Sequence, residues 1–270
     1  MAFKDILVHI DNSPNCAARL ALAIGIAKQH QAHLTGLYVI MHPYYKPEHE
    51  SNGLMAADAE ASFRQETAQA GIAAEWLCVD WSVTGVSMTE IVNLHAYHKD
   101  LVIVGQTDRS SRKGDVPADL PERVVVGSGR PVLVVPYAGT FAISGKRVMV
   151  AWRAGRESVR ALSDAMPFLV DAQQVCVLAV NPPTAEEGPG RSCCDDITTH
   201  LSRHGVDAKV EKFAAADIQV GDLLLNRAWE EGCELLVMGA YSHTARGTLA
   251  LGRVAKDVLR HMTVPVLMSH

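Results

Sequence analysis

The sequence predicts an α/β protein made of two similar domains, each an open, five-stranded parallel sheet with helices on both faces. Short apolar runs alternate along the chain with longer segments whose apolar residues recur at helical spacing. This alternation is typical of parallel strands joined by right-handed helical crossovers. The pattern begins again near the middle of the chain, and 270 residues are long for one domain but sufficient for two.

The first predicted strand, residues 3–10, ends at the polar cluster Asp11-Asn12-Ser13-Pro14. A continuous apolar run is expected of a strand buried on both faces, and a polar cluster with proline is typical of a helix start. The alanine- and leucine-rich residues 15–30 predict the helix that follows. Residues 42–52 are expected to form an exposed loop. The other elements expected in this half are strands at 33–40, 75–80, 101–104 and 131–136 and helices at 54–70 and 88–98.

The same succession follows residues 137–145, a short segment of small residues where we place the domain boundary. The predicted domains are residues 1–138 and 145–270. Strands are expected at 146–151, 174–180, 208–213, 235–238 and 264–268, and helices at 157–169, 192–204, 220–231 and 251–259.

Residue spacing supports an internal repeat. Gly105 and Gly239 are separated by 134 residues, as are Pro131 and Pro265. Near the front of each half the offset is 142, so Asp11 corresponds to Arg153. The second copy is therefore shorter in its middle, and we expect the missing residues to come from its loop around 182–190.

Composition excludes several classes of function. A net charge of −5 argues against electrostatic binding to nucleic acid. No apolar run reaches the roughly 18 residues of a membrane span, and the first residues lack the pattern of a signal peptide. We therefore expect a cytoplasmic protein with no nucleic-acid or membrane partner. The six cysteines show no C-x-x-C spacing, and the histidines lack the partners of a metal site, so no metal site is predicted.

The segment after the strand at 235–238 resembles the nucleotide signature of the universal stress protein family. A loop between a strand's carboxyl end and a helix start is where α/β proteins hold phosphate. The family's signature is Gly, two residues, Gly, nine residues, Gly, then Ser, Thr or Asn. This chain has Gly239, Ser242 in place of the second glycine, Gly252, and Arg253 in place of the hydroxyl residue, followed by a closing RHMTVPVLMSH that is typical of the family.

The resemblance covers essentially the whole chain and implies a tandem universal stress protein with two flavodoxin-like (adenine nucleotide alpha hydrolase-like) domains. It implies that an adenine nucleotide, ATP (with Mg²⁺) or AMP, or a related anion binds in the second domain. The residues expected at this site are Trp152, Arg153, Val180, Met238, Gly239, Ser242, His243, Gly252, Arg253 and Val254. Arg153 and Arg253 could grip a phosphate together; alternatively, Arg253 fills the pocket and the site is empty.

The first domain is expected to have lost the family's nucleotide site. Asp11 stands where family members carry an aspartate beside the nucleotide. In the later loop, however, Asp108 and Asp119 fall where the second glycine and the hydroxyl residue belong, and carboxylates there would repel phosphate. Pro117 and Pro121 also remove backbone donors. We therefore expect no ATP binding of the family's kind in this domain.

By resemblance, the role is in stress survival, through nucleotide-responsive binding rather than turnover, since no catalytic constellation stands out. Two alternatives remain open: a scaffold that acts through a protein partner, and a slow ATPase. The apolar edge strands 132–135 and 266–268 are expected to pack the two domains together about a pseudo-two-fold axis. A homodimer is a further possibility.

Overall fold

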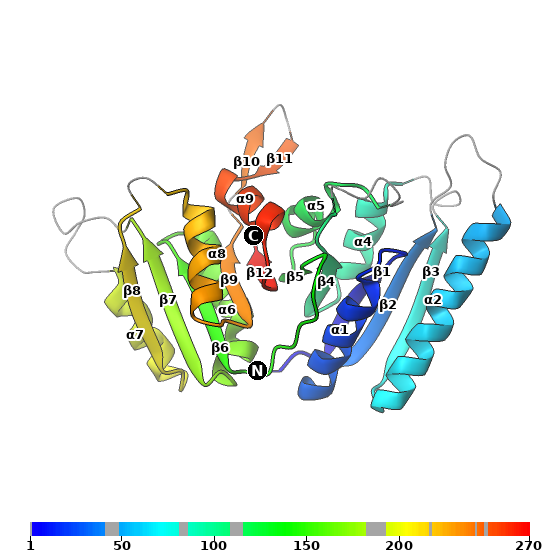
Figure 1. Cartoon of the computed structure of the whole chain (residues 1–270), viewed down its shortest axis with the longest axis horizontal. Helices are drawn as coiled ribbons and strands as arrows, with labels where there is room; N and C mark the ends of the chain where they lie inside the picture. The colour runs from blue at the N-terminus through cyan, green and yellow to red at the C-terminus, as the bar shows by residue number, and fades with distance from the viewer. Residues whose placement is uncertain are drawn as a thin grey trace. The chain divides into compact units, whose positions relative to one another are not determined.

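A computed structural model describes residues 2–40, 49–80, 86–108, 116–181, 193–215, 218–240, 242–245 and 248–270. For residues 49–53, 193–195, 242–245 and 248–250 it describes the backbone alone. The chain divides into two compact units, Ala2–Phe141 and Ala142–His270, each with five parallel strands and helices packed on them (Figure 1).

The first unit contains a five-stranded sheet in the order β3-β2-β1-β4-β5. Every neighbouring pair is parallel. The strands are β1 (Asp5–Ile10), β2 (His33–Ile40), β3 (Ala74–Asp80), β4 (Leu101–Gly105) and β5 (Val132–Val135). The order reverses between β1 and β4, the first and fourth strands along the chain.

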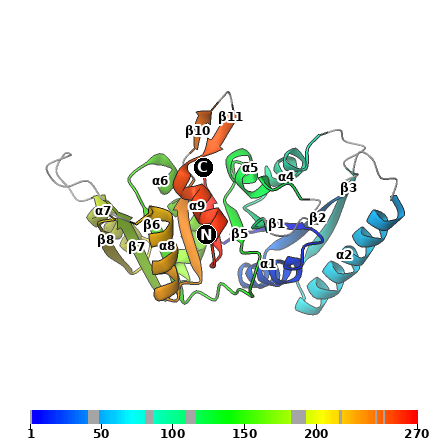
Figure 2. The same cartoon turned by 45° about the horizontal axis from the view of Figure 1, so that its top comes forward.

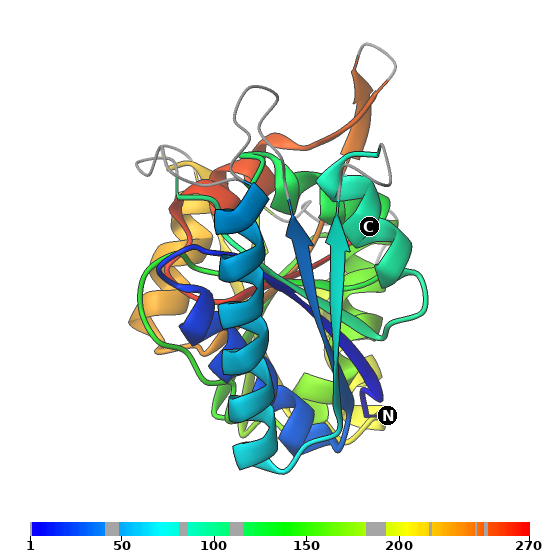
Figure 3. The same cartoon turned by 90° about the vertical axis from the view of Figure 1, so that its right-hand side faces the viewer.

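Helices cover both faces of this sheet. Figure 3 shows α2 and α4 on opposite sides of β2 and β3. The helices are α1 (Cys16–His30), α2 (His49–Ala70), α4 (Met88–Ala96) and α5 (Leu120–Gly127). α1 and α2 pack side by side on one face, and α4 and α5 on the other. The expected loop at 42–52 was wrong at its end, because α2 begins at His49; residues 41–48 lie outside the described part of the chain.

The second unit repeats this arrangement in the order β8-β7-β6-β9-β12, again with parallel neighbours. Its strands are β6 (Arg147–Trp152), β7 (Gln174–Val180), β8 (Ala208–Phe213), β9 (Leu235–Gly239) and β12 (Val266–Ser269). Its helices are α6 (Arg156–Val170), α7 (Cys193–Arg203), α8 (Val220–Glu230) and α9 (Arg253–His261). α6 and α7 lie on one face and α8 and α9 on the other (Figure 1). The predicted fold class is confirmed.

The segment between the predicted strand 235–238 and the predicted helix 251–259, expected to be a loop, contains an additional element. The segments β10 (Ser242–Ala245) and β11 (Thr248–Leu251) pair antiparallel, with Ser242 opposite Leu251. Figure 2 shows this hairpin beyond the start of α9. The sequence interpretation of the whole segment as an irregular loop was therefore wrong.

The core of each unit lies along its central strands. In β4 and β9, Leu101–Val104 and Leu235–Val237 are completely buried. Such continuous apolar runs are expected where helices cover both faces of a parallel sheet. Among the helices of the described residues, none has the length and apolar character needed to cross a membrane.

Candidate functional site

The strand order identifies one crevice in each unit. Ligands of open parallel sheets bind beyond the carboxyl ends of the strands, where the strand order reverses. Here that place lies between β1 and β4 in the first unit and between β6 and β9 in the second. The chain leaves β1 through Asp11 and leaves β6 through Arg153. The side chains at these two corresponding positions therefore carry opposite charges.

In the first unit an internal ion pair occupies the crevice. The Arg19 guanidinium of α1 lies 2.9 Å from the Asp11 carboxylate, measured from Nη2 to Oδ2, and the two side chains are 3% and 11% exposed. Arg19 also donates from Nε to the carbonyl oxygen of His9 at 2.9 Å. The amide of Ser13 donates to Asp11 Oδ1 at 2.9 Å. Asp11 is thus already fully engaged within the unit.

Gly105, at the end of β4, makes room for the same arginine. A side chain at this position would overlap the Arg19 guanidinium. The glycine is therefore explained by a close internal contact, and the guanidinium fills the space between β1 and β4 that a ligand of this crevice would need.

Electrostatics keep the ion pair charged and its neighbour neutral. Burial alone would raise the pKa of Asp11, but the Arg19 charge, His9 and hydrogen bonds from Ser13 lower it to about 2. His9, whose Nδ1 lies 3.6 Å from Asp11 Oδ2, is completely buried. Burial lowers the pKa of His9 to about 4, although Asp11 acts in the opposite direction. At neutral pH the cluster consequently contains one carboxylate, one guanidinium and a neutral imidazole.

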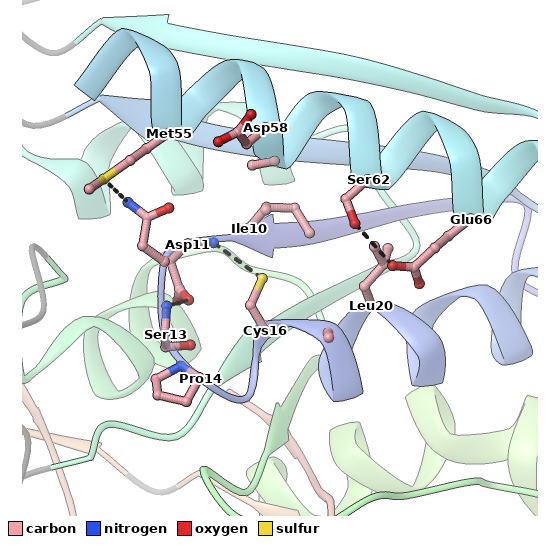
Figure 4. A pocket seen from close by; sticks show the side chains of 13 residues that line it. Ile10, Asp11, Ser13, Pro14, Cys16, Leu20, Met55, Asp58, Ser62 and Glu66 are labelled. Atoms are coloured by element: carbon pink, nitrogen blue, oxygen red, sulfur yellow. Dashed lines mark hydrogen bonds between the residues drawn. The ribbon is translucent and has the colours of Figure 1, made fainter. Parts of the chain in front are cut away.

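A pocket of about 350 Å³ lies beside this cluster, between the end of β1, α1 and α2 (Figure 4). Ile10 and Leu20 give it apolar walls. On the α2 side it is lined by Asp58 and Glu66, and Glu66 accepts a hydrogen bond from Ser62 at 3.2 Å. Among the described residues, no basic side chain lines this pocket. Its charge disfavours a phosphate group.

In the described part of the second unit, no ion pair corresponds to Asp11–Arg19. The buried faces of α1 and α6 correspond when residues 142 positions apart are compared. At the place where α1 carries Arg19, α6 has Ala161, which is 1% exposed. Arg153, in the position of Asp11, is exposed and forms no hydrogen bond or ion pair within the described residues. Trp152 before it is buried, and its indole Nε1 has no hydrogen-bond partner in that part of the chain.

Gly239 at the end of β9 faces the first turn of α6. A Cβ atom at this position would lie 2.6 Å from both the carbonyl carbon of Glu157 and the amide nitrogen of Ser158. Real Cβ atoms do not approach backbone so closely. Gly239 is therefore needed for the packing of α6 on β9, whereas the sequence interpretation assigned it to the approach of a ligand.

The start of α9 holds the last part of the family-like segment. Gly252 is the N-cap residue, with φ −63° and ψ 160°, and it supplies no side-chain hydrogen bond to the helix. Arg253 donates from Nη2 to Gln219 Oε1 at 3.0 Å, and its Nε lies 3.7 Å from Asp257 Oδ2. The guanidinium is 78% exposed and engages groups of α8 and α9.

Comparison with known proteins agrees with this architecture. The model of the universal stress protein family matches residues 2–136 and 197–270. The chain belongs to the universal stress protein family. It is a tandem member, because the two matched segments fall in the two units. No curated protein matches the chain.

Solved universal stress proteins share the fold over the full length. One from Archaeoglobus fulgidus DSM 4304 is 18% identical, with a TM-score of 0.73, and the alignment covers 98% of this chain and 96% of that one. A candidate universal stress protein from Pseudomonas aeruginosa UCBPP-PA14 is 17% identical, with a TM-score of 0.64 and coverage of 99% and 93%. At these identities the similarity concerns the fold alone.

The universal stress protein fold brings several of the predicted site residues to neighbouring strand ends. Met238 is buried beside Ala151, and half-buried Val180 ends the strand next to β6. Half-buried Val254 lies in the first turn of α9. Ser242 and His243 belong to β10, where the backbone alone is described. Asp11 lies in the other unit and is engaged by Arg19.

Two residues of the first crevice escaped sequence analysis. Arg19 stands on the otherwise apolar face of α1, and His9 interrupts an apolar strand. A charged or titratable residue in such a position is a signal, because it must find a partner when buried. The partner itself could not be identified without the structure. Among the described residues, no three His, Cys, Asp or Glu side chains are grouped as metal ligands would be.

Proposed function

We propose that this universal stress protein is a cytoplasmic stress-response sensor or regulator that binds an adenine nucleotide, ATP or AMP, or a related anion in its second unit. The observation that carries the proposal is Arg153 after the end of β6, which has no hydrogen-bond or ion-pair partner among the described residues. In the first unit the corresponding position holds an aspartate that is already neutralised by Arg19. A guanidinium without a partner at a sheet's ligand-binding edge favours an anionic ligand.

Two further features support this proposal. The start of α9 has no side-chain cap at Gly252, so its first amides have no partner within the helix. Helix N-termini of this kind favour phosphate. The partial family signature formed by Gly239 and Gly252 supports a nucleotide at the same end of the sheet.

Binding without turnover is proposed because of the chemistry of the side chains at the crevice. Among the described residues, three arginines dominate the charge around the second crevice, Arg153, Arg156 and Arg253, although Glu157 lies in the first turn of α6. Arginine stays protonated in proteins and cannot act as a general base near neutral pH. A sensor that changes its nucleotide occupancy is thus favoured over an ATPase.

The test is calorimetric titration of the full-length protein with ATP, with and without Mg²⁺. We compare Gly252→Asp with Gly252→Ser, because both residues suit an N-cap with these backbone angles but only aspartate adds a negative charge. The expected result is binding by the serine variant and loss of binding by the aspartate variant.

Other results would favour the alternatives. A flat titration at millimolar ATP and AMP would contradict nucleotide binding and leave a scaffold that acts through a protein partner. Release of ADP during prolonged incubation with ATP and Mg²⁺ would instead indicate a slow ATPase. A requirement for Mg²⁺ would point to a triphosphate as the ligand.

A further inference from the structure

We infer that the first turn of α6, together with Arg153 and Arg156, forms the phosphate subsite of the second unit. This inference deepens the proposed function and rests on it where the phosphate belongs to a nucleotide. It places the anionic group on the segment that follows β6, whereas the family-like signature places it on the segment that follows β9.

The start of α6 presents backbone donors without partners. Its N-cap is Gly155, which has no side chain to accept a hydrogen bond from the helix. The first hydrogen bond of the helix runs from the amide of Val159 to the carbonyl of Gly155. The amides of Arg156, Glu157 and Ser158 therefore have no acceptor within the helix. They point toward the carboxyl end of the sheet, where the helix dipole is positive.

Two arginines flank this turn without ion-pair partners. Arg153 and Arg156 are both exposed, and neither forms a hydrogen bond or ion pair in the described part of the chain. One turn further along, Arg160 is paired with Asp164 at 2.8 Å. The opposing charge in the first turn is the carboxylate of Glu157. This carboxylate lies close to Gly155, because its Oε2 would be 3.5 Å from a Cβ atom added there. The turn keeps an excess of positive charge, which favours an anion.

Two buried polar groups lie on the same face as this turn. Ser269 of β12 pairs in register with Gly239, and Trp152 follows the registered pair Ala151–Met238. Neighbours in register on parallel strands direct their side chains to the same face. Gly239 faces the first turn of α6. The side chains of Trp152 and Ser269 consequently lie on the α6 face, on either side of that contact.

Neither group has a partner within the described residues. Ser269 is 1% exposed and Trp152 9%, yet Ser269 Oγ and Trp152 Nε1 make no hydrogen bond there. Buried polar atoms are nearly always paired, so two unpaired donors beneath one helix start indicate a bound group that completes their hydrogen bonding. A phosphate, with several acceptor oxygens, suits donors that converge from a helix start, guanidinium groups and a hydroxyl.

The corresponding turn of the first unit differs in its charge and in some of its hydrogen bonds. There the Ser13 amide already donates to Asp11, and the Cys16 amide donates to the Ser13 carbonyl oxygen. The guanidinium in that crevice is neutralised by Asp11. Among the described residues, a positive charge that no carboxylate neutralises is thus found at this place in the second unit, where Arg153 replaces the aspartate.

The experiment is calorimetric titration of the full-length protein with pyrophosphate, AMP and adenosine. The variants are Arg153→Gln, Arg156→Gln and the double substitution, with Arg160→Gln as the matched control on the same helix. Since all three arginines are exposed, thermal unfolding should show that each variant remains folded. We expect the double variant to bind pyrophosphate and AMP at least about tenfold more weakly, and the control to bind like the wild type.

The outcomes separate this inference from the proposed function. If AMP binds equally to wild type and to the double variant but is lost in Gly252→Asp, the phosphate lies at α9 and the inference is overturned, while nucleotide binding stands. A different outcome is that pyrophosphate binding depends on the arginines, but the adenosine part of AMP adds no affinity. That outcome would support the inference and contradict a nucleotide-specific site. Absence of binding by every phosphate compound would overturn the inference.

Discussion

At the scale of single residues, the Asp11–Arg19 pair determines the chemistry of the first unit. Removing two charges from water is costly, and the cost is recovered when the partners face each other and their remaining hydrogen-bonding groups are satisfied. The partners face each other, Arg19 Nε also donates to the His9 carbonyl oxygen, and Asp11 accepts from Ser13. Arg19 Nη2 has no hydrogen bond among the described residues, so the second condition is met only in part. The pair fills the ligand crevice of its unit.

Substitution of one partner should show how strongly the pair is coupled. Arg19→Met leaves Asp11 buried without its counter-charge, so we expect a loss of about 3–5 kcal/mol in the free energy of unfolding. The matched control is Arg64→Met, because the Arg64–Glu60 pair is exposed and should contribute less than about 0.5 kcal/mol. Urea unfolding measures both. Equal losses in the two variants would show that the buried pair is not a major contribution.

His9 should make the protein less stable in mild acid. Its pKa is about 4 in the folded state and 6.5 for the ordinary side chain, so between these values the unfolded chain binds more protons. Stability is therefore lost as the pH falls from 6.5 toward 4. From about pH 7.5 to about pH 4.5 the loss assigned to His9 is about 2–3 kcal/mol.

The measurement compares urea unfolding of the wild type and His9→Leu at these two pH values. The variant should lose less stability on acidification than the wild type by about that amount. Both pH values lie above 3.8, the ordinary pKa of an aspartate, and the pKa of Asp11 in the folded protein is about 2. The contribution of Asp11 to stability is lost only at lower pH. The same pH dependence in both proteins would contradict a neutral, buried His9.

At the scale of elements, two equivalent glycines serve different contacts. Gly105 and Gly239 both end the fourth strand of their unit. Gly105 gives room to the side chain of Arg19, whereas Gly239 gives room to the backbone of α6. A helix backbone cannot move aside as a side chain can, so the position of α6 over β9 depends on this glycine.

Replacement of Gly239 should therefore disturb helix packing. Gly239→Ala places a methyl group against the backbone of Glu157 and Ser158, and we expect a loss of about 1–3 kcal/mol. The control is Gly25→Ala in α1, where no atom lies within 4 Å of the added group. Alanine should stabilise that helix by about 0.5–1 kcal/mol. Thermal unfolding distinguishes the two signs, and unchanged stability of the Gly239 variant would contradict the packing argument.

The sequence predicted the elements with long or strongly periodic patterns and missed those without them. β2, β7 and β8 have the predicted bounds, because each is an apolar or alternating run with turn residues at its ends. The β10–β11 hairpin is short and polar. Its signals were an alternating pattern and a two-residue connection, 246–247, whose second residue is glycine. α2 begins within a segment containing Asn52 and Gly53, where local propensity is weak.

At the scale of the whole molecule, the two units share one strand order and differ in the charge of their crevices. The repeat in the sequence was sufficient to predict the shared order, and it also revealed the change from Asp11 to Arg153. It could not show that Arg19 is buried against Asp11, nor that Ala161 leaves Arg153 without such a partner. Those facts depend on side-chain contacts between residues that are distant in sequence.

We propose that this tandem universal stress protein has one anion-binding unit and one unit closed by its own ion pair. The most direct test is the stoichiometry of AMP or ATP binding to the full-length chain, measured by calorimetry with and without Mg²⁺. We predict a single site per chain, lost when Gly252→Asp or the Arg153 and Arg156 substitutions change the second unit. Two equivalent sites, or a single site that survives all of these substitutions, would contradict it.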